Sequence, residues 1–214
     1  LHILDNHFWE EHDKGMESWQ ENGNLFYRIQ GPLIEQWNLN DCLSTKDDQF
    51  QAIVRCLEGE QAILQVARDF TQSKHAVWGI TARNPEQNFA LNLLLDPEID
   101  FVTLQGTAGT GKTLLTIAAG LMQVMDLKRY NEIIMTRVTI PVGEDIGFLP
   151  GTEEEKMTPW MGALIDNLEV LHGTQEGGSF GRSATQDVLQ DKIKIRSLNY
   201  MRGRTFLNRF IIID

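Results

Sequence analysis

The segment Gly106–Thr113, with the sequence GTAGTGKT, restricts what this chain of 214 residues can fold into more than any other feature. It matches the pattern G-x-x-x-x-G-K-[ST], in which a loop joins a strand to a helix and its backbone N–H groups surround phosphate oxygens. Because Gly106, Gly109 and Gly111 have no Cβ, the backbone can turn sharply and approach a ligand closely. The segment therefore predicts an α/β protein with a phosphate-binding loop.

The polar groups of this loop have predicted partners on a nucleotide. We expect Lys112 to reach the β- and γ-phosphates of ATP and the Thr113 hydroxyl to coordinate Mg²⁺. The positive end of the helix that begins here adds to the attraction for phosphate. The predicted ATP-binding residues of the loop are Gly106, Thr107, Ala108, Gly109, Thr110, Gly111, Lys112 and Thr113.

The sequence ends with a second motif, Phe210 to Asp214 (FIIID), in which β-branched residues precede an aspartate. This run has the composition of a fully buried parallel strand. A phosphate-binding loop works with an aspartate at the end of a neighbouring strand, whose carboxylate holds the water shell of Mg²⁺. We therefore predict that Asp214 and Thr113 bind the metal and that Lys112 and Asp214 are catalytic.

Hydrolysis also needs a base that orients the attacking water. In many P-loop ATPases that base directly follows the aspartate, a position that this sequence does not contain. The sequence also begins with Leu1 rather than Met. We expect a piece of a longer protein, one that binds ATP without efficient hydrolysis.

Strand and helix signals alternate along residues 79–214. Asn84 and Pro85 mark the start of one helix, since Asn is a favoured N-cap and Pro a favoured first helical residue. Alternation at this spacing predicts a parallel sheet flanked by helices, as in RecA-like P-loop NTPases. The expected helices are 85–95, 111–125 and 152–171, the expected strands are 99–105, 132–137, 192–198 and 209–214, and a loop is expected at 172–186.

Residues 1–78 have a different pattern, which predicts a small β-rich module. Short segments with aromatic and β-branched residues are separated by turn signals, and Asn22-Gly23-Asn24 is a good hairpin turn. The stretch 47–70 fits neither the helical nor the strand period, so its secondary structure stays open.

Composition excludes several classes of protein. The net charge of −11 argues against a protein that coats nucleic acid over its whole surface. The bases are concentrated at 192–209, where a local basic surface can form, while the acids are concentrated at 1–23. No apolar stretch is long enough to span a bilayer, and the N-terminus does not resemble a signal peptide. Cys42 and Cys56 lack metal or redox spacing, so we expect inert thiols in a cytoplasmic protein.

Gln87 is a further candidate for nucleotide binding. It lies in RNPEQNFAL, about twenty residues before the loop, and N-P-E-Q followed by a helix resembles the adenine-recognition segment of superfamily 1 helicases. An amide both donates and accepts hydrogen bonds, which matches the N6 and N7 edge of adenine. The alternative is a polar residue in a well-capped helix.

Three stretches together resemble the PhoH family of ATPases: TLQGTAGTGKTLLTIAAGL, IIMTRVTIPVGEDIGFLPGTEEEKMTPW and NYMRGRTFLNRFIIID. The resemblance covers about residues 79–214 and is closest to the longer members, in which a PIN ribonuclease domain and a linker precede the ATPase. It implies that the N-terminal module is that linker. The family continues after the aspartate with E-A-Q, which this chain lacks, and residues 172–186 look longer than the family's loop.

The resemblance implies ATP-dependent RNA unwinding coupled to RNA cleavage, with single-stranded RNA as a partner. It also implies roles for Arg137, Arg202 and Arg204, either at the γ-phosphate or on RNA phosphates. A structural ion pair is the alternative for each of them. Two other functions stay open: a nucleotide-dependent switch that assembles into a homo-oligomeric ring, and a phosphotransferase acting on a small acceptor.

Overall fold

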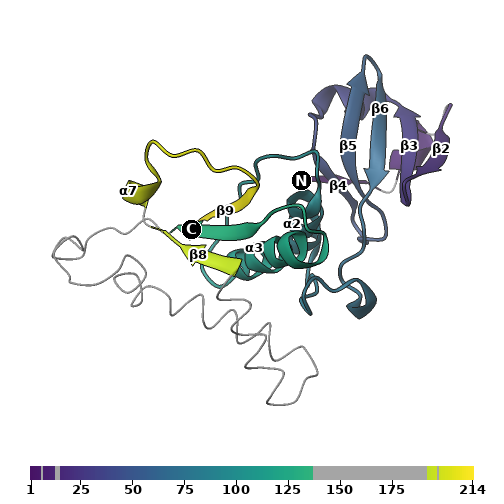
Figure 1. Ribbon diagram of the computed structural model, residues 1–214. Helices are drawn as coiled ribbons and strands as arrows, with labels where there is room; N and C mark the ends of the chain where they lie inside the picture. Colours follow the sequence, from purple (N-terminus) through teal and green to yellow (C-terminus); the bar gives the residue numbers. More distant parts are fainter. Residues whose placement is uncertain (6, 13–14, 137–191, 197) are drawn as a thin grey trace, which may run out of the picture. The chain divides into compact units, whose positions relative to one another are not determined.

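The structure is a computed structural model that describes residues 1–5, 7–12, 15–136, 192–196 and 198–214 (Figure 1). It divides into two compact units, each made of two segments of the chain. The first contains Leu1–His75 and Ala82–Leu93, and the second contains Ala76–Thr81 and Leu94–Asp214. The boundary expected after residue 78 falls within the short segment that belongs to the second unit, and it stays a prediction.

The first unit is built on a six-stranded sheet, which confirms the β-rich N-terminal module. The strand order is β1-β4-β5-β6-β3-β2, and all neighbours are antiparallel except β1 and β4. The strands are β1 (His2–Leu4), β2 (Glu17–Glu21), β3 (Asn24–Gln30), β4 (Cys42–Thr45), β5 (Gln51–Glu58) and β6 (Gln61–Val66). The helices among its described residues are α1 (Phe8–His12), η1 (Pro32–Gln36), η2 (Ser73–His75) and α2 (Pro85–Leu95), whose last two residues belong to the second unit.

Turn chemistry explains the β2–β3 hairpin of this sheet. Asn22 and Gly23 both have positive φ, 50° and 79°, as the tight turn between β2 and β3 requires. The undecided stretch 47–70 forms the β5–β6 hairpin. Its pairing shifts register between Val54 and Cys56. Because the bulge at Arg55 interrupts the alternation of side chains, the strand period could not be recognised in the sequence.

One face of the sheet is covered by the core of the first unit. Phe8 and Trp37 are buried there with apolar residues from the strands. His12 is also fully buried, and its ring stacks on that of Phe8 with the centroids 4.5 Å apart. The imidazole Nδ1–H donates to the Phe8 carbonyl at 2.8 Å, while Nε2 accepts from the Leu33 N–H at 3.4 Å. Both ring nitrogens therefore have partners, as a buried polar side chain needs.

The described residues of the second unit form a parallel sheet of three strands in the order β8-β7-β9. They are β7 (Glu132–Thr136), β8 (Ile193–Ile195) and β9 (Arg209–Ile213), so the strands expected at 132–137, 192–198 and 209–214 are confirmed, each somewhat shorter. The helices described here are α3 (Lys112–Leu121), continued by the π-helical turn η3 (Met122–Asp126), and α7 (Leu198–Met201).

Helix α3 packs closely on this sheet (Figure 1) because Gly120 faces it. A Cβ on Gly120 would lie 2.9 Å from the Phe210 ring and 3.0 Å from Cδ1 of Ile133, so only glycine allows this approach. The other side of β9 is open: Ile212 is buried, whereas Ile211 and Ile213 are exposed. The expectation that this strand is buried on both faces is therefore wrong for the described residues, because they supply packing for only one of its faces.

The strand expected at 99–105 is also wrong. No strand is assigned there, and Phe101 is 81% exposed. Half-buried Val102 and Leu104 alternate with exposed residues, so the extended pattern is present, but no neighbouring strand in the described residues pairs with it. The helix at 85–95 is confirmed, and that at 111–125 is confirmed except for its π-helical last turn. The expectations for 152–171 and 172–186 lie outside the described residues. No helix among the described residues is long and apolar enough to cross a membrane.

Candidate functional site

The loop before α3 owes its shape to two glycines. Gly109 and Gly111 have φ of 79° and 84°, a left-handed conformation that side chains with a Cβ rarely adopt. Gly111 is the N-cap of α3, and its carbonyl accepts the first helical hydrogen bond from the Leu115 N–H at 2.9 Å. The chain thus turns directly into the helix, with the free N–H groups of the first helical turn at the loop.

Lys112 folds back over this loop. Its ammonium group donates to the carbonyls of Gly106 and Thr107 at 3.0 and 2.8 Å and to the Thr110 hydroxyl at 3.3 Å. The Thr110 hydroxyl in turn donates to the Thr107 carbonyl at 2.9 Å. The lysine charge therefore lies at the centre of the loop, and phosphate oxygens entering it would replace carbonyls as its acceptors.

Thr113 and Asp214 meet in the structure although they lie far apart in the sequence. The Thr113 hydroxyl donates to Oδ1 of Asp214 at 3.2 Å. Asp214 follows β9, and its N–H donates to the Thr136 carbonyl at the end of β7 at 2.9 Å, so β7 holds the backbone of the aspartate in place. The parallel pairing of β7 and β9 thus brings a carboxylate to the start of α3.

The oxygen donors at this point fit a hard divalent cation. A hydroxyl and a carboxylate are ligands that Mg²⁺ accepts, and Mg²⁺ keeps several waters and uses phosphate oxygens rather than a cage of protein ligands. Within the described part of the chain, no group of three or more His, Cys, Asp or Glu side chains could hold a metal ion. Thr113 and Asp214 would therefore hold Mg²⁺ together with a bound polyphosphate.

Gln87 lies in the first turn of α2, where its side chain has a capping role. Its Oε1 accepts from the Arg83 N–H at 2.8 Å, and its own N–H donates to Oδ1 of Asn84 at 2.9 Å. Asn84 is thus the N-cap that the sequence predicts. The structure places Gln87 in the first unit and the loop in the second, and the predicted adenine contact stays a prediction.

The predicted arginines lie near α7 or outside the described residues. Arg202 and Arg204 flank Gly203, whose φ is 74°, in the turn that follows α7. Both are exposed, and neither forms an ion pair with a residue that the structure describes. Arg137 lies outside the described residues. The structure therefore leaves Arg202 and Arg204 accessible to a ligand and does not bring either to the loop.

Thr136 is a residue of this region that the sequence did not single out. It ends β7, it is fully buried, and its carbonyl holds the Asp214 N–H. Its hydroxyl makes no hydrogen bond within the part of the chain that the structure describes. The sequence signal that could have identified Thr136 was its position one residue before the end of the predicted strand 132–137.

Comparison with known proteins identifies the family to which this region is similar. Residues 79–214 match the family described as "PhoH-like protein". The chain belongs to the PhoH-like family. The matched region contains the loop, Thr113, Asp214 and both described arginines, so the elements that form the candidate site all lie within the PhoH-like part.

Individual PhoH-like relatives resemble the same part of the chain. It is 46% identical over 138 residues to "Protein PhoH2" of Bacillus subtilis, which covers 64% of this chain and 30% of the relative. It is 37% identical over 140 residues to "Protein PhoH2" of Mycolicibacterium smegmatis, covering 64% and 30%. It is 36% identical over 135 residues to "Protein PhoH" of Escherichia coli K12, covering 63% and 36%. The chain thus spans about a third of the length of these relatives.

Proposed function

We propose that this PhoH-like chain binds ATP together with Mg²⁺, and that the intact protein binds single-stranded RNA and uses ATP hydrolysis to unwind or remodel RNA. One observation supports the nucleotide-binding part of this proposal: Lys112, Thr113 and Asp214 lie together at the start of α3. A RecA-like core belongs to the same proposal. The parallel order β8-β7-β9, with α3 packed on one face, supports it.

Each group at the loop would have a defined task. Backbone N–H groups of Ala108 to Thr113 and the positive end of α3 would bind the phosphates, and Lys112 would neutralise charge on the β- and γ-phosphates. Thr113 and Asp214 would hold Mg²⁺, which offsets the charge that develops on the phosphate oxygens during transfer to water. Gln87 would recognise the adenine edge if its amide exchanges the capping contact for the base.

The metal part of this proposal is tested with Asp214→Asn. We expect the affinity for a fluorescent ATP analogue in the presence of Mg²⁺ to fall about tenfold or more, because a charge-assisted contact is replaced by a neutral one. The affinity measured in EDTA should stay unchanged. Asp100→Asn, at an exposed residue of the same unit, is the control. Equal losses with and without Mg²⁺ would contradict a metal-binding role for Asp214.

RNA binding is tested through the exposed arginines after α7. Arg202→Ala or Arg204→Ala should each weaken binding of a single-stranded RNA several-fold and lower the slope of log affinity against log salt by about one, because one phosphate contact is lost. The exposed Lys46, in the first unit, provides the control Lys46→Ala.

An assembly function without RNA remodelling is the second candidate. It is favoured by the exposure of Arg202 and Arg204, since an accessible arginine can also act on the nucleotide of a neighbouring subunit. If the chain bound no RNA at any salt concentration, we would prefer a nucleotide-dependent homo-oligomeric switch. We expect a homo-oligomer under either function.

A further inference from the structure

The outer face of the first unit's sheet, opposite its core, carries two aromatic side chains that are not buried. Trp19 on β2 lies directly across from Phe26 on β3, and their rings stack with centroids 5.5 Å apart. The Arg28 guanidinium lies 5.6 Å from the centre of the Trp19 ring and binds Glu17 at 2.7 Å. The solvated face of an antiparallel sheet is normally polar, so a half-exposed aromatic pair indicates a contact surface.

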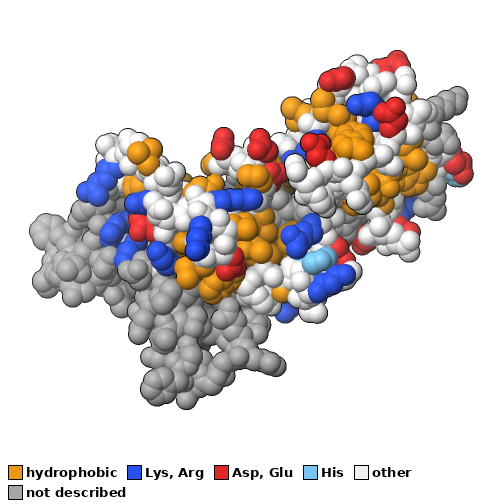
Figure 2. Space-filling model, turned by 45° about the vertical axis from the view of Figure 1, so that its right-hand side comes forward, with side chains coloured by type: hydrophobic (Ala, Val, Ile, Leu, Met, Phe, Trp, Pro, Cys, Tyr) orange, Lys and Arg blue, Asp and Glu red, His pale blue; other side chains and the backbone are white. Residues whose placement is uncertain are grey.

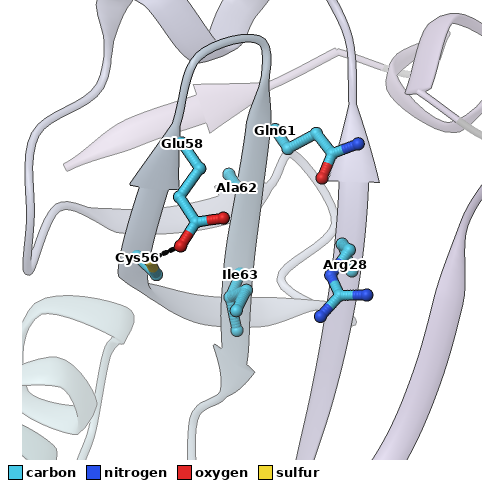
Figure 3. Close-up of a pocket in the computed structure, with 6 residues that line it drawn as sticks. All are labelled: Arg28, Cys56, Glu58, Gln61, Ala62 and Ile63. Carbon is cyan, nitrogen blue, oxygen red and sulfur yellow. Dashed lines mark hydrogen bonds between the residues drawn. The ribbon is translucent and has the colours of Figure 1, made fainter.

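A shallow depression of the surface continues it towards the β5–β6 turn (Figure 3). Ile63 contributes an apolar side chain, and Arg28 and Glu58 lie on the strands to either side of it. The exposed Glu60 in the turn accepts a hydrogen bond from Gln30, which shares the face with Arg28. Three carboxylates, those of Glu17, Glu58 and Glu60, therefore surround one end of this surface, which we call the acidic face.

The charge of the first unit determines which partner suits the acidic face. Its two segments contain 14 Asp and Glu residues against seven Lys and Arg residues. Figure 2 shows hydrophobic side chains lying between acidic ones on this unit. Such a surface repels the phosphates of nucleic acid and attracts a cationic partner, for which both carboxylates and aromatic rings are good acceptors.

The sequence itself carries a segment of that chemistry. Lys192 to Arg209 contains six Lys and Arg residues and no Asp or Glu. Arg209 binds Glu132 at 2.7 Å, whereas Arg202 and Arg204 are exposed. In its described part, Leu198 and Leu207 are 38% and 72% exposed, next to the exposed Arg202 and Arg204. Alternating cations and apolar side chains complement a face made of carboxylates and aromatic rings. We call residues 192–209 the basic segment.

We propose that the acidic face of one copy binds the basic segment of a second copy. This inference deepens the homo-oligomer of the proposed function and rests on it. The two surfaces differ, so the contact is head-to-tail and repeats until a ring closes or a filament forms. Arg202 and Arg204 would then be shared: RNA phosphates and the carboxylates of a neighbouring copy compete for the same guanidinium groups, and RNA loosens the assembly.

A charge exchange tests the contact in the full 214-residue chain. We expect the parent to assemble at low salt and to dissociate at high salt in sedimentation velocity. The double variants Glu58→Lys/Glu60→Lys and Arg202→Glu/Arg204→Glu should each weaken assembly at least tenfold. An equimolar mixture of the two, or a chain with all four changes, should recover it, because opposite charges face each other again. A loss caused by misfolding would not be recovered in this way.

Glu11→Lys/Glu35→Lys is the matched control, since it changes the net charge equally at exposed residues of α1 and η1. A chain that is monomeric at every concentration, or a mixture that does not recover assembly, would overturn the proposal. So would unchanged assembly of Glu58→Lys/Glu60→Lys, which would show that the carboxylates of the acidic face do not hold the contact. Binding of ATP and RNA by the parent, measured separately, tests the proposed function independently of this contact.

Discussion

Lys112→Ala is expected to abolish the stabilisation of this chain by ATP. The parent at an ATP concentration a hundred times its Kd should gain about 2.7 kcal/mol of unfolding free energy, which raises its melting temperature by several degrees. The variant loses the charge that lies at the centre of the loop, where the ammonium group contacts the carbonyls of Gly106 and Thr107. Thermal unfolding with and without Mg²⁺–ATP measures the difference.

Lys74→Ala provides the control, because Lys74 is an exposed lysine of the first unit. It should leave the ATP-dependent shift unchanged. The melting temperature of Lys112→Ala without ATP shows whether the loss of the loop contacts lowers stability by itself. A full ATP-dependent shift in Lys112→Ala would mean that the loop does not bind the nucleotide as we propose.

Gly31→Ala should destabilise the first unit by about 3 kcal/mol or more. The added Cβ would lie 2.1 Å from Cδ2 and 2.5 Å from Nε2 of the His12 ring. The ring cannot move aside freely, because it is fully buried, stacks on Phe8 and uses both nitrogens in hydrogen bonds. Overpacking costs about 1–3 kcal/mol and a buried polar group that loses its partner costs a similar amount. Denaturant unfolding followed by tryptophan fluorescence measures the loss.

A double-mutant cycle identifies the cause. The φ of Gly31 is 165°, an extended conformation that alanine adopts, so backbone strain makes no contribution. His12→Ala alone is destabilising, but adding Gly31→Ala to it should cost little, because the methyl group then has space. If the two substitutions were simply additive, the clash with His12 could not be the reason.

The candidate site was largely predictable because its signals are local. GTAGTGKT carries its own backbone requirements, and the structure has Gly109 and Gly111 in the left-handed conformation that the motif needs. The pairing of Thr113 with Asp214 was predictable for a different reason: a phosphate-binding loop works with an aspartate at the end of a neighbouring strand, and the structure brings Asp214 after β9 to the Thr113 hydroxyl. The chemical roles of these residues stay predictions.

The sequence predictions were wrong or incomplete where the local structure depends on residues far away in the sequence. Residues 99–105 have the composition of a strand, but a strand exists only with a neighbour, and sequence composition does not supply one. The β5–β6 hairpin was not recognised because the bulge at Arg55 breaks its alternation. The sequence gives no signal of the contact between His12 and Gly31, because these residues are distant in the sequence and meet only when the core of the first unit has formed.

The π-helical turn Met122–Asp126 determines what the deletion of a residue at the end of α3 would change. A π turn holds one residue more than an α turn, and the wider turn is where Gln123 is buried and donates to the Leu94 carbonyl at 2.7 Å. Deleting one residue here would narrow the turn to an ordinary α-helical one and leave the register of α3 unchanged. The hydrogen bond of Gln123 to Leu94, and that of the Trp78 indole N–H to Asp126 at 3.0 Å, both depend on the wider turn and would be lost or displaced. A single-residue deletion in this turn should thus weaken these two contacts without disturbing the helix before it.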